Sequence, residues 1–301
     1  MRLELTVLGT ASQAPTRERG QGGYVLRWFD EVVLFDPGEG SQRQLLLAKM
    51  SPAQIDRVFI THFHGDHCLG LPGLLQSRAL STDRPITVHY PSSGESYVDH
   101  LLGGCAIDFD LRVHRVPIEA GHRLQTTRYV VSTAELDHPT PAIGYRLEEP
   151  AGRHLLPDRL ATAGLEGESI AQLRRAGRIR SRTGTIDVRS VSEIRQGPSM
   201  AYVMDTALGD GARHLAFGVD LLICEATYLS SEAHLAAGHG HMTAAQAGQL
   251  AADAGVGLLV IGHYSARYDD IAAFADEARR YFPRVIAARD FTCIPWLTRA
   301  T

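Results

Sequence analysis

Lysine, cysteine and long apolar runs are scarce in this sequence, and each scarcity argues against a class of protein or of binding site. Lys49 is the only lysine, so the positive charge of the 301 residues comes almost entirely from arginine. Acidic residues outnumber basic ones by 34 to 30, and the formal net charge of −4 excludes a protein that is basic over its whole surface. Binding to nucleic acid would therefore need a local basic patch. No run of 18 apolar residues occurs, so no membrane span is expected.

The cysteines are few and indicate neither disulfides nor a thiolate metal site. They are Cys68, Cys105, Cys224 and Cys293, and their wide spacing fits no disulfide framework or zinc-binding pattern. We expect buried free thiols, which suit a reducing cytoplasm. The first six residues alternate like a strand and lack the apolar core of a signal peptide, which also predicts a cytoplasmic location.

Histidine, in contrast, is concentrated in one short stretch, residues 61–71, which read T-H-F-H-G-D-H-C-L-G-L. The cluster within it consists of His62, His64, Asp66 and His67. Residues 57–60 have the composition of a short buried strand, and Gly65 permits a tight turn. Residues 69–80 have helical length, with Pro72 near the start, where proline is tolerated. The cluster is therefore expected on a loop at the C-terminal end of a strand, where α/β proteins place their chemistry.

Three imidazoles and a carboxylate within six residues suit zinc or another borderline divalent ion. Chance histidines on a solvated loop are less favoured, because a turn needs only Gly, Asn, Asp or Ser. Other candidates are weaker alone. Asp36, before a Pro-Gly turn, could orient a metal-bound histidine or cap a helix expected over residues 41–48. His138, at the end of a predicted strand, is as consistent with a core residue as with a ligand.

The motif T-H-F-H-G-D-H resembles the central motif of the metallo-β-lactamase superfamily. Its extended form over residues 55–75, I-D-R-V-F-I-T-H-F-H-G-D-H-C-L-G-L-P-G-L-L, resembles one branch, the RNase Z endoribonucleases that process the 3′ end of tRNA. Further segments resemble this family in the same order along the chain, from Asp36 to Asp290. They include D-P-G-E-G-S-Q at residues 36–42, E-A-T at residues 225–227 and H-Y-S-A-R-Y at residues 263–268.

The resemblance implies an α/β protein with the metallo-β-lactamase fold, a four-layer αββα sandwich with two mixed sheets. It implies a single domain over residues 1–301, with a tRNA-binding arm inserted at about residues 148–197. Five arginines fall within nine positions of that stretch: Arg174, Arg175, Arg178, Arg180 and Arg182. In an acidic protein this cluster favours contact with a phosphate backbone, although Arg174 and Arg175 would also suit the C-terminus of a helix.

The resemblance also implies a site for two zinc ions. One ion would be held by His62, His64 and His138. The other would be held by Asp66, His67 and His263, and Asp205 would bridge the two. Manganese is an alternative, because it also binds histidine and aspartate. Two such ions activate a water and clamp the attacking and leaving oxygens of an in-line displacement, which suits a phosphodiester better than a peptide.

Release of a 3′-hydroxyl requires a proton on the departing oxygen. By resemblance, Glu225 and His241 form the carboxylate–imidazole pair that donates it, and Asp66 accepts a hydrogen bond from the attacking hydroxide. His239 is close enough in sequence to be an alternative donor. Thr243 is the expected N-cap of the next helix. The resemblance further implies a homodimer in which the arm of one subunit serves the active site of the other.

Three functions stay open. The first is a zinc-dependent endoribonuclease that removes the 3′ trailer from precursor tRNA and leaves a 3′-hydroxyl. The second is a hydrolase of small molecules on the same fold, a phosphodiesterase, arylsulfatase or lactonase. Two departures from the family favour it: Met204 replaces the glycine before Asp205, and the arm has Glu166-Gly167-Glu168 instead of Gly-Pro. A third departure, the absence of an Arg-Asn pair from residues 15–21, weakens the resemblance in that loop. The third is a non-catalytic RNA- or protein-binding relative that has lost its metals, and the complete set of seven ligand candidates argues against it.

Overall fold

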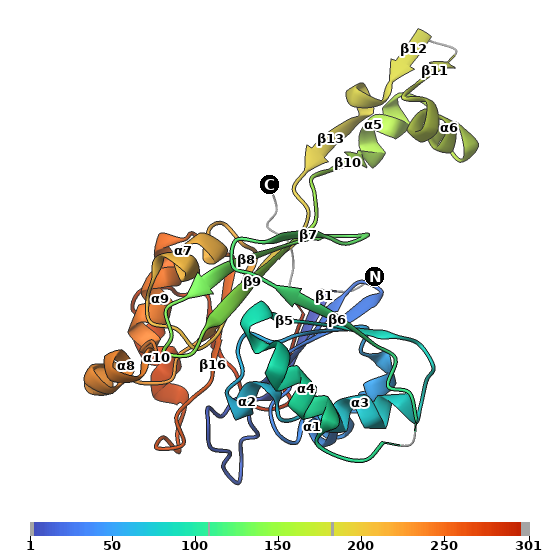
Figure 1. Ribbon diagram of the computed structural model, residues 1–301. Helices are drawn as coiled ribbons and strands as arrows, with labels where there is room; N and C mark the ends of the chain where they lie inside the picture. Colours follow the sequence, from blue (N-terminus) through green and yellow to red (C-terminus); the bar gives the residue numbers. More distant parts are fainter. Residues whose placement is uncertain (1–2, 108, 182–183, 296–301) are drawn as a thin grey trace.

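Two β-sheets stacked face to face form the centre of the molecule (Figure 1). The computed structural model describes residues 3–107, 109–181 and 184–295, and within these residues each of the two sheets has seven strands. In spatial order the first consists of β18 (Cys293–Pro295), β1 (Leu3–Gly9), β2 (Gly23–Trp28), β3 (Glu31–Phe35), β4 (Arg57–Phe59), β5 (Ile86–Pro91) and β6 (Val113–Ile118). The second consists of β17 (Val285–Ala287), β16 (Leu258–Gly262), β15 (Leu221–Glu225), β14 (Ser199–Val203), β9 (Ala142–Glu148), β8 (Val130–Leu136) and β7 (Arg123–Gln125).

Each sheet combines a parallel half with an antiparallel half. In the first sheet the neighbours from β3 to β6 run parallel, and those from β18 to β3 run antiparallel. In the second sheet the neighbours from β14 to β17 run parallel, and those from β14 to β7 run antiparallel. The parallel halves place several strand ends at one edge, which is where the site is built.

Alternation along the strands explains why the two sheets stack. In β3, Val33 and Phe35 enter the core between the sheets, whereas Val32 and Leu34 pack toward the outer helices. The Phe35 ring stacks on Tyr202 of the second sheet with ring centroids 4.7 Å apart. Because successive side chains of a strand face opposite sides, a strand that is apolar throughout contributes to both cores.

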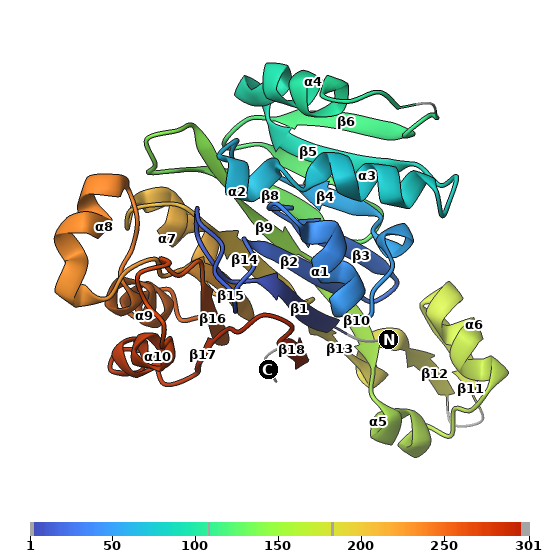
Figure 2. The same cartoon turned by 90° about the horizontal axis from the view of Figure 1, so that it is seen from below.

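Helices cover the outer face of each sheet and complete four layers (Figure 2). The first sheet is covered by α1 (Ser41–Leu47), α3 (Leu71–Ala79) and α4 (Glu95–Gly103), and the second by α7 (Asp210–Ala216), α9 (Ala244–Asp253) and α10 (Ala272–Arg279). Two further helices are α2 (Gly65–Cys68), a single turn, and α8 (Ala233–His239). Short 3₁₀ helices occur at Pro52–Gln54, Ser92–Gly94, Val188–Val191 and Ser230–Glu232. The predicted αββα sandwich with two mixed sheets is confirmed.

The segment between β9 and β14 projects away from this body (Figure 1), and we call it the arm. Its stalk is β10 (Gly152–Leu155) paired antiparallel with β13 (Ser192–Arg195). Its tip contains α5 (Pro157–Thr162), α6 (Glu168–Ala176), β11 (Arg178–Ser181) and β12 (Gly184–Asp187). The tip has a small apolar core of its own, formed by Leu160, Leu165, Leu173, Ile179 and Val191. The arm is therefore ordered by its own packing and joined to the body through two strands.

Local predictions fail at two places. Gly65 does not form a tight turn but begins α2, and the helix expected over residues 69–80 starts only at Leu71, with Pro72 in its first turn. The four cysteines are free, but Cys105 after α4 and Cys293 in the edge strand β18 are exposed, so the expectation of buried thiols is wrong for these two. Among the described helices none has the length and apolarity that crossing a membrane requires.

Candidate metal centre and active site

The predicted site residues lie at strand ends along one edge of the two sheets. Asp36 follows β3, residues 62–67 follow β4, Asp205 follows β14, Glu225 ends β15 and His263 follows β16. Parallel strands of one sheet end at the same edge, so this topology brings the residues together. Asp36, Asp205 and His263 have positive φ angles of 46°, 49° and 64°. This left-handed backbone is uncommon for residues with side chains and is typical of functional positions.

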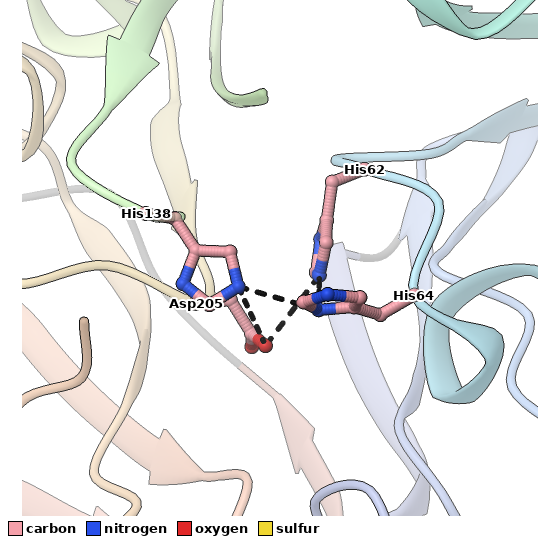
Figure 3. Close-up of side chains that lie close together, drawn as sticks. All are labelled: His62, His64, His138 and Asp205. Carbon is pink, nitrogen blue, oxygen red and sulfur yellow. Dashed lines mark hydrogen bonds and ion pairs between the residues drawn. The ribbon is translucent and has the colours of Figure 1, made fainter. Parts of the chain in front are cut away.

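The first donor group consists of His62, His64, His138 and Asp205, whose side chains point toward one another from three separate segments (Figure 3). The Nε2 atom of His62 lies 2.9 Å from His64 Nδ1 and 3.6 Å from Asp205 Oδ2. The Nε2 atom of His138 lies 3.3 Å from His64 Nδ1 and 4.0 Å from Asp205 Oδ2. Tetrahedral zinc ligands at about 2.0–2.2 Å from the metal are themselves about 3.4 Å apart. The spacing therefore suits one shared cation.

The second donor group consists of Asp66, His67, Asp205 and His263. The Nε2 atom of His67 lies 3.3 Å from both Asp66 Oδ2 and Asp205 Oδ1. The Nε2 atom of His263 lies 3.3 Å from Asp66 Oδ2 and 3.1 Å from Asp205 Oδ1. Asp205 thus faces the first group with Oδ2 and the second group with Oδ1. The structure brings all seven predicted donors together, with Asp205 between the two groups.

The donor residues are better suited to binding divalent cations than to forming hydrogen bonds with one another. His67 Nε2 and Asp205 Oδ1 are buried and 3.3 Å apart, yet neither atom makes a hydrogen bond. Four carboxylates, those of Asp36, Asp66, Asp205 and Glu225, are no more than 4% exposed. Burying so many carboxylates is costly unless positive charge compensates them. Imidazole nitrogens and carboxylate oxygens in this arrangement match the ligand preference of zinc.

Most of the donors are held in the deprotonated form that binds metal. Burial lowers the pKa of His62 well below its usual range, and His67 lowers it further. Burial alone would raise the pKa of Asp205, but His263 and His67 outweigh it and hold this pKa well below its usual range. Burial alone would lower the pKa of His67, but the carboxylates of Asp205 and Asp66 outweigh burial and raise it well above its usual range. That rise reflects concentrated negative charge, which a bound cation would neutralise.

Asp36 organises the histidine loop from the adjacent strand. Its Oδ2 accepts hydrogen bonds from Nδ1 of His67 at 2.9 Å and from Oγ1 of Thr61 at 2.8 Å, and its Oδ1 accepts from the Thr61 backbone N–H at 2.7 Å. Thr61 Oγ1 in turn lies 3.0 Å from His62 Nδ1. Asp36 therefore orients one histidine of each group. The alternative in which Asp36 caps α1 is wrong, because the N-cap of α1 is Gly40.

Two threonines make contacts that the sequence did not predict. Thr140 Oγ1 lies 2.9 Å from His64 Nε2. Thr227 Oγ1 lies 2.9 Å from His263 Nδ1 and donates a hydrogen bond to Glu225 Oε2 at 2.6 Å. Each hydroxyl fixes one ring nitrogen, so that the other nitrogen faces the donor group. Both threonines stand two residues after a predicted site residue, but threonine is too common for that spacing to indicate a role.

Glu225 and His241 form a hydrogen-bonded pair beside the donors. Nδ1 of His241 lies 2.9 Å from Oε1 of Glu225. The Glu225 side chain is fully buried; its Oε1 also accepts a hydrogen bond from the backbone N–H of Thr206, and its Oε2 accepts one from the backbone N–H of Met242. Burial would lower the pKa of His241, but Glu225 outweighs burial and raises this pKa to about 9. The imidazole is therefore protonated at neutral pH, with Nδ1–H directed at Glu225 and a second proton on Nε2.

The donors open onto a cavity of about 400 Å³ whose lining includes His64, His138, His239 and His241. His239 differs from His241 in its surroundings. It is the exposed last residue of α8, and its ring makes no hydrogen bond to another residue in the described parts of the chain. The geometry therefore favours His241, with its carboxylate partner, over His239 as a proton donor.

Two departures from the family pattern leave the site intact. Met204 is fully buried in the core between the sheets, and Asp205 beside it still reaches both donor groups. The loop of residues 15–21, which lacks the Arg-Asn pair, contains the buried Arg19. Its guanidinium donates hydrogen bonds to the carbonyl oxygens of Ser265 at 3.4 Å and Tyr268 at 2.8 Å. The loop therefore braces the segment that follows His263.

The predicted RNA-binding arginines lie on the tip of the arm. Arg174 and Arg175 occupy the last turn of α6, where positive charge complements the helix dipole, and Arg178 and Arg180 follow in β11. All four are exposed. Arg182 lies outside the described residues. The structure thus separates the four described arginines from the donor groups, because the tip projects away from the body (Figure 1).

The fold is that of the metallo-β-lactamase superfamily, whose family model matches residues 24–122. The structure is similar to that of YhfI from Bacillus subtilis, a metallo-β-lactamase fold protein. The TM-score is 0.71, with 97% of this chain and 98% of that chain covered, and at 16% identity the likeness shows the fold alone.

Relatives of higher sequence identity show to which family within this superfamily the chain belongs. The chain is 47% identical to a ribonuclease Z of Nocardia farcinica, with 97% of each chain covered, and 40% identical to a ribonuclease Z of Chlamydia trachomatis, with 95% of each covered. It is 26% identical to the short form of human tRNase Z, with a TM-score of 0.68 and coverage of 97% and 98%. The chain belongs to the ribonuclease Z family, as its motifs predicted.

Proposed function

We propose that this chain is a metal-dependent endoribonuclease that removes the 3′ trailer from precursor tRNA and leaves a 3′-hydroxyl on the tRNA. One observation carries the proposal: two donor groups that share Asp205 open onto the same cavity as His241, the imidazole that is paired with Glu225. This combination supplies both halves of phosphodiester hydrolysis, a place for an activated water and a proton for the leaving oxygen. Similarity to ribonuclease Z proteins over the full length supports the choice of RNA as substrate.

The donor groups are proposed to hold two zinc ions, with manganese as an alternative. The first ion would be bound by His62, His64 and His138, the second by Asp66, His67 and His263, and Asp205 would contact both. When bound, such a pair of ions activates a water and stabilises charge on the oxygens of the displacement. Zinc is favoured because histidine nitrogen supplies most of the donors.

The side chains around the ions handle the protons. Asp66, whose pKa His67 and His263 hold below its usual range against the opposing effect of burial, is ionised and can accept a hydrogen bond from the attacking water. Glu225 holds Nδ1–H of His241, which leaves the proton on Nε2 available for the departing 3′-oxygen. The transfer leaves a neutral imidazole, and the buried carboxylate then favours recharging from solvent.

The arm, at about residues 148–197, is proposed to grip the tRNA. Its exposed arginines, Arg174, Arg175, Arg178 and Arg180, provide the local basic patch that an acidic protein needs to attract a phosphate backbone, and Arg182 belongs to the same proposal. The distance of the tip from the donors suits contact with a part of the substrate remote from the cleavage point.

We also propose a homodimer in the cytoplasm, in which the arm of one subunit serves the site of the other. Four leucines on or next to the helices over the first sheet support an interface there, since they are 49–76% exposed: Leu46, Leu47, Leu69 and Leu80. Size-exclusion chromatography with light scattering would test this state, and a monomer at micromolar concentration would contradict it.

The central test compares a precursor tRNA with a generic aryl phosphodiester, each with and without a chelator. We expect cleavage directly after the discriminator nucleotide, abolished by the chelator and restored by zinc. Turnover of the aryl compound alone would indicate a hydrolase of small molecules instead. Absence of turnover on both substrates would indicate a non-catalytic relative that has lost its metals.

A further inference from the structure

His239 lines the cavity above the donors but belongs to neither donor group. Its ring is nearly parallel to that of Tyr228, with an angle of 18° and centroids 6.5 Å apart. Stacked nucleobases lie about 3.4 Å apart. The centroids of the two nearly parallel rings are separated by roughly twice this spacing, and both rings line a cavity that would receive RNA, so a base can be held between them.

The backbone fixes His239 although its side chain is exposed. The next residue, Gly240, has a φ of 69°, and a Cβ added there would lie 2.6 Å from Cδ of Pro139. The Gly240 carbonyl oxygen also lies 3.2 Å from Nδ1 of His138. The end of α8 is therefore pressed against a donor of the first group, and His239 stays at a set position relative to the donors.

Tyr228 is equally constrained on the other side. It is 8% exposed, its backbone N–H donates to Met242 and its carbonyl accepts from Ala244. The guanidinium of Arg267 lies 5.4 Å from its ring centroid. A cation against an aromatic ring holds the ring in place and leaves a polarised stacking surface. These contacts hold the Tyr228 ring in place before the substrate binds, and the fixed backbone at His239 limits the conformational entropy that stacking costs.

We propose that His239 and Tyr228 form an aromatic clamp for the nucleobase on one side of the scissile phosphate. The proposal rests on the proposed function, because it takes the substrate to be RNA. Base–aromatic stacking tolerates any base, since every base has a π face. Such a clamp positions the backbone for cleavage without demanding a particular sequence, which suits an enzyme that processes many different precursors.

The test compares His239→Ala and His239→Phe on precursor tRNA. We expect H239A to lower kcat/KM by about 10- to 100-fold, the range expected for loss of one stacked base. We expect H239F, which keeps a flat ring but cannot transfer a proton, to retain a rate within about threefold of the wild type. His234→Ala is the matched control, because His234 is an exposed histidine of the same helix outside the cavity. Zinc content, measured for each variant, should be unchanged.

Two further substrates carry an abasic nucleotide directly 5′ or directly 3′ of the scissile phosphate. On one of them, wild type and H239A should react equally fast, because there is no base to hold. H239A as fast as wild type on the intact precursor, H239F as slow as H239A, or a penalty that persists on both abasic substrates would each overturn the clamp. If the wild type leaves the intact precursor uncut, the proposed function fails and the clamp with it, whereas the other outcomes refute the clamp alone.

Discussion

The body and the tip of the arm use charge in opposite ways. In the body, carboxylates and imidazoles are buried at strand ends and fixed by hydrogen bonds such as those of Asp36 and Thr227. In the tip, arginines are exposed on a small unit with a core of its own. Burial makes each charge in the body depend on its neighbours, whereas the exposed charges act almost independently and are screened by salt.

This contrast assigns different kinetic roles to the two regions. Substitutions among the buried charges should alter metal content or kcat, because they change the reacting centre itself. Substitutions on the tip should alter only the binding of tRNA. A change in the tip that lowers turnover of a small phosphodiester would break the comparison.

The largest effect is expected at Asp205, because both donor groups use its carboxylate. Asp205→Ala should reduce bound zinc and lower kcat/KM by at least about 1,000-fold on both precursor tRNA and aryl phosphodiester. Zinc is measured by mass spectrometry of the purified protein, and Asp276→Ala, an exposed aspartate of α10, is the control. Full zinc content in the alanine variant would show that the carboxylate is not a ligand.

His241→Ala should rank next, since it removes the proton donor and leaves the donor groups in place. We expect kcat to fall by about 100- to 1,000-fold with zinc content unchanged. A precursor with a better leaving group, a 3′-phosphorothiolate at the scissile bond, should restore much of the rate, because sulfur leaves without a proton. Absence of this rescue would argue against the role of His241.

The dependence of activity on pH tests the Glu225–His241 pair rather than His241 alone. Because Glu225 raises the pKa of His241 to about 9, the protonated donor is present at neutral pH and is lost as pH rises through that value. Activity should therefore fall at high pH with a midpoint near 9. Glu225→Gln removes the negative charge, so the falling limb should move to lower pH. An unchanged limb in a folded, metal-loaded E225Q variant would contradict the assignment.

A smaller effect is expected at Asp36, which touches the histidine loop but belongs to neither donor group. Asp36→Asn keeps the shape but places an N–H donor where one carboxylate oxygen accepted, so the three hydrogen bonds from His67 and Thr61 cannot all be kept. Zinc affinity should weaken by about 10- to 100-fold, as measured by competition with a chromogenic chelator. Asp253→Asn, on the exposed face of α9, is the control. Equal zinc affinities in the two variants would show that Asp36 does not stabilise the metal site.

The sequence predicted the donors of the site but not all of the side chains that orient them. The types of the donor side chains and their positions at strand ends could be predicted from the sequence, because H-x-H-x-D-H follows an apolar strand and Asp205 and His263 follow two others. The contacts of Thr140 and Thr227 could not be, since hydroxyl partners depend on how distant segments meet in space. Nor could the sequence choose between His239 and His241, which are two residues apart. The choice rests on Glu225, whose strand brings its carboxylate to only one of the two rings.

The smallest effect per residue is expected on the tip of the arm. Replacing Arg174, Arg175, Arg178 and Arg180 together by alanine should raise KM for precursor tRNA by about tenfold at physiological salt and leave kcat unchanged. The slope of log KM against log salt should fall by about 3 to 4, because up to four phosphate contacts are lost. The control removes four exposed arginines of the body, Arg213, Arg279, Arg280 and Arg284. If this control changes the salt slope as much as the arm variant does, the attraction comes from overall charge and the arm has no special part in binding.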